Sequence, residues 1–230
     1  FNEMNSNLPD NNVMTTNIDK DGIIWVGTSG GLVKIKNHEW EVFTTLNSQM
    51  PFDWVQCFHI DSDNNKWLGL TDSWEYPDWV GGGLVVFDGE NWTHYTKENS
   101  GLPDNHVISI TSAKDSAIWI GTFKGGLARF HNSEWQIFTV ENSNLSSNHI
   151  RSLAFDDDNI LWIGTDSGLD SYDGNEFVNL PSGLQKVEAE CACILIDTSN
   201  TKWIGTFYKG LAKVVGSNWG FFVDSRWGNR

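Results

Sequence analysis

Short runs of apolar residues alternate with short polar turns along the whole chain, in a unit that recurs. The third copy shows the unit most clearly, and its pattern predicts strands over residues 107–112, 117–122, 126–130 and 134–139. The segments between these runs carry Asp, Lys, Asn and Ser, which favour tight turns and hairpins. The unit is therefore expected to be a four-stranded antiparallel sheet.

A Trp-aliphatic-Gly tripeptide marks the same place in each copy of the unit. It begins at Trp25, Trp67, Trp119, Trp162 and Trp203, with spacings of 42, 52, 43 and 41 residues. Six residues before the Trp stands an acid in four copies, Asp19, Asp61, Asp156 and Asp197, whereas the third copy has Ala113. A regular period of this length is typical of repeat architectures.

Both faces of the predicted strands are apolar or small. Trp119 falls on one side of its strand and Ile120 on the other, so each sheet must be covered on both faces. Sheets of about 40–45 residues that pack between neighbours are typical of β-propeller blades. A linear solenoid is the alternative, but it needs polar caps, and the first and fifth copies are as apolar as the rest. We therefore predict an all-β fold, a five-bladed β-propeller of four-stranded antiparallel blades, as one domain over 1–230 with blades near 5–46, 47–98, 99–141, 142–180 and 181–224.

The repeat resembles a known family. The residues from Asn5 to Leu32 match almost throughout the pattern Asn-Ser-x-Leu-Pro-x-Asn-x-Val, then Trp-Ile-Gly-Thr-x-x-Gly-Leu, of the two-component regulator propeller repeat. Such repeats typically form the extracytoplasmic sensor region of bacterial hybrid two-component systems, where oligosaccharide ligands are common. The resemblance implies a periplasmic or extracellular sensor propeller, with a signal segment, a signalling partner or further domains outside this chain. A five-bladed propeller also looks like the sugar-binding lectins of that architecture.

The net charge and the hydropathy of the chain argue against several classes of partner. The 230 residues carry 15 Lys and Arg against 30 Asp and Glu, a net charge of −15. This balance argues against binding to nucleic acid or to an anionic membrane surface, because both need clustered basic residues. No apolar run approaches the roughly 18 residues of a membrane-spanning helix.

In a propeller, the connections between blades share one rim with the turns between the second and third strands, here called the ligand rim. The residue just before the first strand of each blade varies, as Asn12, Trp54, His106, His149 and Glu190. A scaffold needs uniform residues where it packs, so this variety favours a composite pocket around the central opening. Five unrelated loop residues would give the same pattern, and that alternative stays open.

The turns between the second and third strands add aromatic and charged residues to this rim. The short turns contribute Phe123, Lys124, Phe207, Tyr208 and Lys209, and a ten-residue insertion in the second copy contributes Trp74, Tyr76, Asp78 and Trp79. Aromatic rings accept the apolar C–H faces of sugars, and carboxylates bind their hydroxyls. The inserted rings could instead fold down as a small core of their own. On the opposite rim, the Asp-rich turns such as 19–22 are expected to be simple Asx turns rather than calcium loops.

No enzyme motif stands out. The sequence has no serine elbow, phosphate-binding glycine loop or paired-cysteine zinc pattern, and no cofactor is predicted. His106, His149 and Glu190 occupy equivalent positions in successive copies and could hold a divalent metal, as in the propeller lyases. We expect non-catalytic recognition of a small polar ligand such as an oligosaccharide. The alternatives are a metal-dependent lyase or hydrolase and a protein-docking scaffold.

Overall fold

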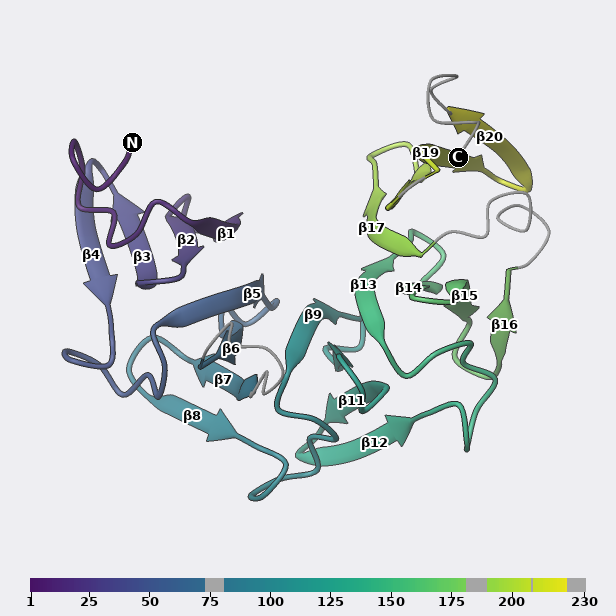
Figure 1. Ribbon diagram of the computed structural model, residues 1–230, viewed down its shortest axis with the longest axis horizontal. Helices are drawn as coiled ribbons and strands as arrows, with labels where there is room; N and C mark the ends of the chain where they lie inside the picture. Colours follow the sequence, from purple (N-terminus) through teal and green to yellow (C-terminus); the bar gives the residue numbers. More distant parts are fainter. Residues whose placement is uncertain (73–80, 181–189, 208, 223–230) are drawn as a thin grey trace. The chain divides into compact units, whose positions relative to one another are not determined.

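The computed structural model describes residues 1–72, 81–180, 190–207 and 209–222. Over these residues the chain forms strands and turns and has no helix. The strands form five antiparallel sheets of four, and each sheet contains strands that follow one another in the sequence (Figure 1). Among the described residues, no helix could therefore cross a membrane.

Each sheet is one copy of the sequence repeat. The first has β1 (Val13–Ile18), β2 (Ile24–Thr28), β3 (Gly31–Lys36) and β4 (Glu39–Phe43); the second β5 (Trp54–Ile60), β6 (Lys66–Thr71), β7 (Gly81–Phe87) and β8 (Trp92–Tyr95); the third β9 (Val107–Ser112), β10 (Ile118–Thr122), β11 (Leu127–His131) and β12 (Glu134–Phe138); the fourth β13 (Ile150–Phe155), β14 (Leu161–Thr165), β15 (Gly168–Tyr172) and β16 (Phe177–Asn179); and the fifth β17 (Cys191–Ile196), β18 (Lys202–Thr206), β19 (Leu211–Val215) and β20 (Asn218–Phe222). The strands of the third copy agree with the predicted ranges to within one residue.

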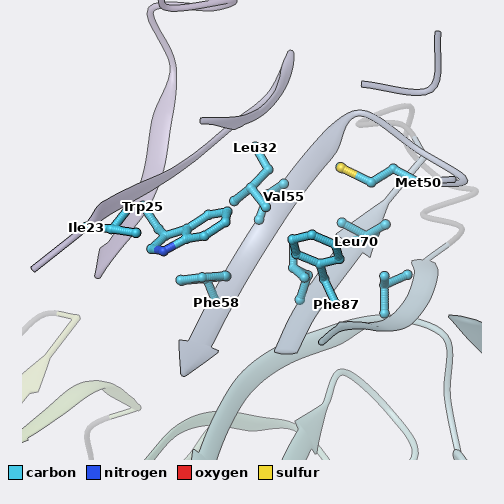
Figure 2. Packing of buried hydrophobic residues seen from close by; sticks show 10 residues of the cluster. Ile23, Trp25, Leu32, Met50, Val55, Phe58, Leu70 and Phe87 are labelled. Carbon is cyan, nitrogen blue, oxygen red and sulfur yellow. The ribbon is translucent and has the colours of Figure 1, made fainter. Parts of the chain in front are cut away.

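The chain divides into two compact units, Phe1–Ile110 and Thr111–Arg230, with the boundary inside β9. In the first unit, Trp25 from β2 packs against Phe58 from β5 and Phe87 from β7, with ring centroids 6.2 and 6.4 Å away (Figure 2). Leu32, Val55 and Leu70 complete the same buried cluster. The Trp of one blade is thus covered by the next blade.

The repeated Trp is a core residue in most copies, as the pattern predicts. Trp25, Trp67, Trp119 and Trp162 are between 2% and 9% exposed. Trp203, in the last blade, is half-buried. In the second unit, Trp119 joins Leu127, Ile150 and Phe177 in one cluster, and Trp162 joins Ile204 in another. The same residue therefore organises the joint between blades in both units.

The Gly of the tripeptide is required by the approach of the next blade. A Cβ atom added at Gly27 would lie 2.7 Å from Val55 Cγ1, and one added at Gly164 would lie 2.5 Å from Cys191 Sγ. Real Cβ atoms do not approach other atoms so closely. In these two joints the inner strand of the following blade therefore packs directly on the backbone of the Trp strand.

Candidate functional site on the rim of the second unit

The turns between the second and third strands are built by the Thr that follows the repeated Gly. Thr122 Oγ1 donates to the Gly126 carbonyl at 2.8 Å and accepts the Gly125 N–H at 3.1 Å. Thr206 closes the equivalent turn of the fifth blade with a 2.8 Å bond to the Gly210 carbonyl. These bonds hold the turn backbone, so the side chains at its tip project from a fixed base.

Backbone hydrogen bonds bring the connections between blades against these turns. The Gly126 N–H donates to the Asn148 carbonyl at 3.0 Å, which places His149 beside the turn that carries Phe123. In the fifth blade, the Phe207 N–H donates to the Glu190 carbonyl at 3.2 Å. The rim residues of the second unit are therefore gathered by main-chain contacts.

A chain of charged contacts runs along this rim. His149 Nδ1 lies 2.5 Å from Asp166 Oδ2, and the other oxygen of Asp166 accepts the Nε–H of Arg151. Arg151 Nη2 then lies 3.4 Å from Glu190 Oε2. The single guanidinium thus bridges two carboxylates, one of which also holds the imidazole. Charge-assisted contacts of this kind fix side-chain orientation.

An aromatic ring lies at each end of the charged chain. Phe123 meets the His149 ring edge-on, with centroids 4.4 Å apart. At the other end, the Arg151 guanidinium lies over the Phe207 ring, 4.7 Å from its centroid, and Phe207 is 47% exposed. We name the set Phe123, His149, Arg151, Asp166, Glu190 and Phe207 the rim strip.

The sequence pattern predicts four members of the rim strip but not Arg151 or Asp166. Arg151 follows Ile150, at a break in the register between β13 and β14 that recurs in blades 1, 2 and 5. A bulge of this kind re-aims a side chain. The equivalent positions in blades 1, 2 and 5 hold Met14, Gln56 and Ala192. The charge at Arg151 is therefore an exception that can be recognised in the sequence.

The remaining predicted site residues have separate places. Lys124 lies beside the rim strip, with Nζ 5.1 Å from the Phe123 ring centroid, and Lys209 is exposed in the turn after Phe207. Trp54 and His106 belong to the first unit, where Trp54 is half-buried and His106 is 8% exposed. Five predicted residues lie outside the described residues, namely Trp74, Tyr76, Asp78, Trp79 and Tyr208.

Within the part of the chain that the structure describes, no group of three or more His, Cys, Asp or Glu side chains could hold a metal ion. His149 and Glu190 contact Asp166 and Arg151, respectively.

The Asp-rich turns of the opposite rim are Asx turns, as expected, because Asp156 Oδ1 accepts the Asp158 N–H at 3.0 Å.

The comparisons with known proteins agree with the repeat pattern. The model of the two component regulator propeller family matches residues 7–30, 101–124 and 144–167, which lie in the first, third and fourth copies. No curated protein matches the sequence.

Two similar solved structures are described as extracellular domains of hybrid two-component systems from B. thetaiotaomicron. The first has a TM-score of 0.76 and 21% identity and the second a TM-score of 0.62 and 20% identity. They align with 94% and 93% of this chain, which spans only 29% and 33% of their lengths. Virginiamycin B lyase from Staphylococcus aureus is also similar, with a TM-score of 0.70, 12% identity, and 93% and 70% of the two chains covered.

At these identities the solved structures establish the fold alone, and the family match adds the kind of repeat. Each of the five sheets has the strand order that the repeat predicts, and the repeated Trp is buried in the first four. Three of the five copies match the two component regulator propeller family model, and the chain has a β-propeller fold of five four-stranded blades.

Proposed function

We propose that the chain is the ligand-recognition part of a sensor and that the rim strip binds a small polar ligand such as an oligosaccharide, without chemical turnover. The observation that carries the proposal is the pairing of an exposed aromatic ring, Phe207, with the bridged Arg151 guanidinium at 4.7 Å. A sugar offers an apolar C–H face and flanking hydroxyls. The rim strip offers the Phe207 ring for the apolar face and charged hydrogen-bonding groups beside it for the hydroxyls.

Electrostatics supports binding at this rim. The chain as a whole has a net charge of −15, yet Lys124, Arg151 and Lys209 stand at the rim of one unit. Asp166 and Glu190 oppose Arg151, so the strip presents both donors and acceptors rather than one sign of charge. Such a mixture suits hydroxyl groups, which both donate and accept.

The same comparisons support a sensor role and an extracytoplasmic location. The repeats are of the two-component regulator type, and two similar structures are described as extracellular domains of such systems. We therefore propose that ligand binding outside the cytoplasm is relayed to a signalling partner or to further domains.

A lyase-type enzyme is the second candidate function. The observation in its favour is the His149–Asp166 pair, because a carboxylate 2.5 Å from Nδ1 orients an imidazole as a general base. The two functions predict different results on prolonged incubation. A binder returns the ligand unchanged, whereas an enzyme converts it.

Calorimetric titration with short neutral and acidic oligosaccharides tests the proposal. The variants Phe207→Ala and Arg151→Gln should each weaken binding by roughly tenfold, the effect of about 1.4 kcal/mol. Phe222→Ala is the matched control, because this ring is also exposed, at 57%, but lies in the outer strand β20. Equal affinities in all three variants, or binding by none of the oligosaccharides, would contradict the proposal.

A further inference from the structure

The joint between the fourth and fifth blades contains a buried carboxylate with three kinds of donor. Asp156 Oδ2 accepts the indole N–H of Trp162 at 2.9 Å and lies 2.9 Å from Lys202 Nζ. Its other oxygen accepts the Ile160 N–H at 2.9 Å. The Asp156 and Lys202 side chains are 1% and 7% exposed. The carboxylate is therefore a structural ligand of the Trp in this joint.

The joint between the first and second blades repeats this arrangement. The indole N–H of Trp25 donates to Asp19 Oδ2 at 3.0 Å, and Lys66 Nζ lies 5.1 Å from the Trp25 ring centroid. Burial raises the pKa of Asp19, but the hydrogen bonds from the indole and the turn backbone outweigh it and hold this pKa below its ordinary value. Such a joint favours a carboxylate in its charged form.

The joint between the third and fourth blades lacks both charged residues. Ala113 stands where the other blades have the Asp, and Leu161 stands where the following blade would supply the Lys. Trp119 keeps its place and is 3% exposed, yet no described residue accepts its indole N–H. A buried donor without a partner costs about 1–3 kcal/mol. This joint therefore has a buried indole donor without an acceptor among the described residues, at a position where the other joints place a carboxylate.

A neighbouring acid replaces only part of the missing carboxylate. Asp115 Oδ1 accepts the Ala117 N–H at 3.0 Å, which is the backbone donor that the absent Asp would have bound. Its Oδ2 accepts the Arg129 Nη2–H at 2.9 Å. Asp115 thus accepts hydrogen bonds from the turn backbone and from the Arg129 guanidinium. The indole N–H of Trp119 still lacks an acceptor among the described residues.

The Trp119 side chain lines a cavity. A cavity of about 430 Å³ is lined by both Ala113 and Trp119, so it includes the place of the missing side chain. Arg129, Gln136, Asn159 and Tyr172 supply polar groups around it. A volume of this size accommodates a small organic molecule.

We propose that this cavity, the Trp119 notch, binds a small ligand through its carboxylate, which takes the place of the Asp carboxylate found in the other joints and accepts the Trp119 indole N–H. The site lies at the turn opposite the rim strip and is independent of it. Asp115 does not exclude a second carboxylate, because Arg129 offsets its charge. Asp21 and Asp158 likewise stand two residues after Asp19 and Asp156.

The test uses acetate as the probe and the intact chain labelled with ¹⁵N. The indole N–H resonance of Trp119 is assigned by its disappearance in Trp119→Phe. Acetate should shift this resonance saturably, while acetamide, which has the same shape without the charge, should not. Ala113→Asp should abolish the acetate response, because it restores the carboxylate within the chain.

A second variant keeps the test decisive if Ala113→Asp does not fold. Ala113→Asn fills the same space with a neutral acceptor and should also remove the acetate response. Retention of the full acetate shift in a folded variant of either kind would overturn the proposal. So would the absence of a saturable shift in the unaltered chain, or an equal shift with acetamide.

Discussion

Trp162 donates its indole N–H to Asp156 at 2.9 Å, and this bond ties the second strand of a blade to the turn that precedes it. The same pair occurs as Trp25 with Asp19, Trp67 with Asp61, and Trp203 with Asp197. The spacing of six residues in the sequence is therefore the signature of one hydrogen bond. Its consequences for stability can be measured separately in different blades.

Replacing Asp156 by Ala should destabilise the protein by about 3–5 kcal/mol, because it leaves the Lys202 ammonium buried without its carboxylate. Asp197→Ala is the matched control, since it removes the same indole bond at a carboxylate that lies in a solvent-accessible turn. Urea unfolding should show the larger loss for Asp156→Ala. Equal losses would mean that the buried ion pair adds nothing.

Replacing Trp119 by Phe should cost less stability than replacing Trp162 by Phe. Both changes shrink a buried ring, but only Trp162→Phe also breaks a hydrogen bond and leaves Asp156 with one donor fewer. Trp119→Ala, which removes the whole ring, should cost about 3–5 kcal/mol. Midpoints of thermal unfolding test the order, and a greater loss for Trp119→Phe than for Trp162→Phe would contradict the assignment of an unmet donor.

Ser146 and Asp170 should be energetically coupled. Asp170 Oδ2 accepts both the N–H and the hydroxyl of Ser146 at 2.8 Å. In three other copies Pro stands at the position of Ser146, and Val or Ala stands at the position of Asp170. Asp170→Val alone should cost about 1–3 kcal/mol, because it leaves the Ser146 N–H without its acceptor. Adding Ser146→Pro should recover part of this loss. A double-mutant cycle measures the coupling, and strictly additive losses would refute it.

His59 should make stability depend on pH between about 4 and 6.5. Burial lowers the pKa of His59 to about 4, with a smaller opposing effect from Asp61. The unfolded chain therefore binds a proton near pH 6.5 that the folded chain does not, so stability is full above that pH and falls as the pH decreases through the window. The loss should reach roughly 3 kcal/mol at the acid end.

The check on this pH dependence is a series of urea unfolding curves for the unaltered chain and for His59→Gln. The variant should have a flatter profile between pH 6.5 and 4, since it has no group that titrates at this position. An unchanged slope would show that other residues cause the acid loss.

The fold could be predicted from the sequence because each blade repeats the same few contacts. The Trp, the following Gly and the preceding Asp recur at fixed spacings, and each has a single packing or hydrogen-bonding role, as at Trp25, Gly27 and Asp19. Burial of four of the five repeated Trp residues confirms the prediction. Trp203 departs from it and is half-buried.

The candidate site was harder to predict because it depends on exceptions to the repeat. Phe123 and Phe207 stood out as aromatics in turns, but Arg151 lies inside a strand and reaches the rim from a bulge. Asp166 was indistinguishable from an ordinary turn residue until its contacts with His149 and Arg151 were known. Ala113 was visible as an exception, yet only the structure shows the indole that it leaves unsatisfied.

The location of a bound oligosaccharide tests the central claim most directly. The tightest binder found by calorimetry should be soaked into crystals of the intact chain. We predict density on the rim strip, with a sugar ring against Phe207 and hydroxyls within hydrogen-bond distance of Arg151 and Asp166. Density on any other surface, with the rim strip empty, would contradict the account.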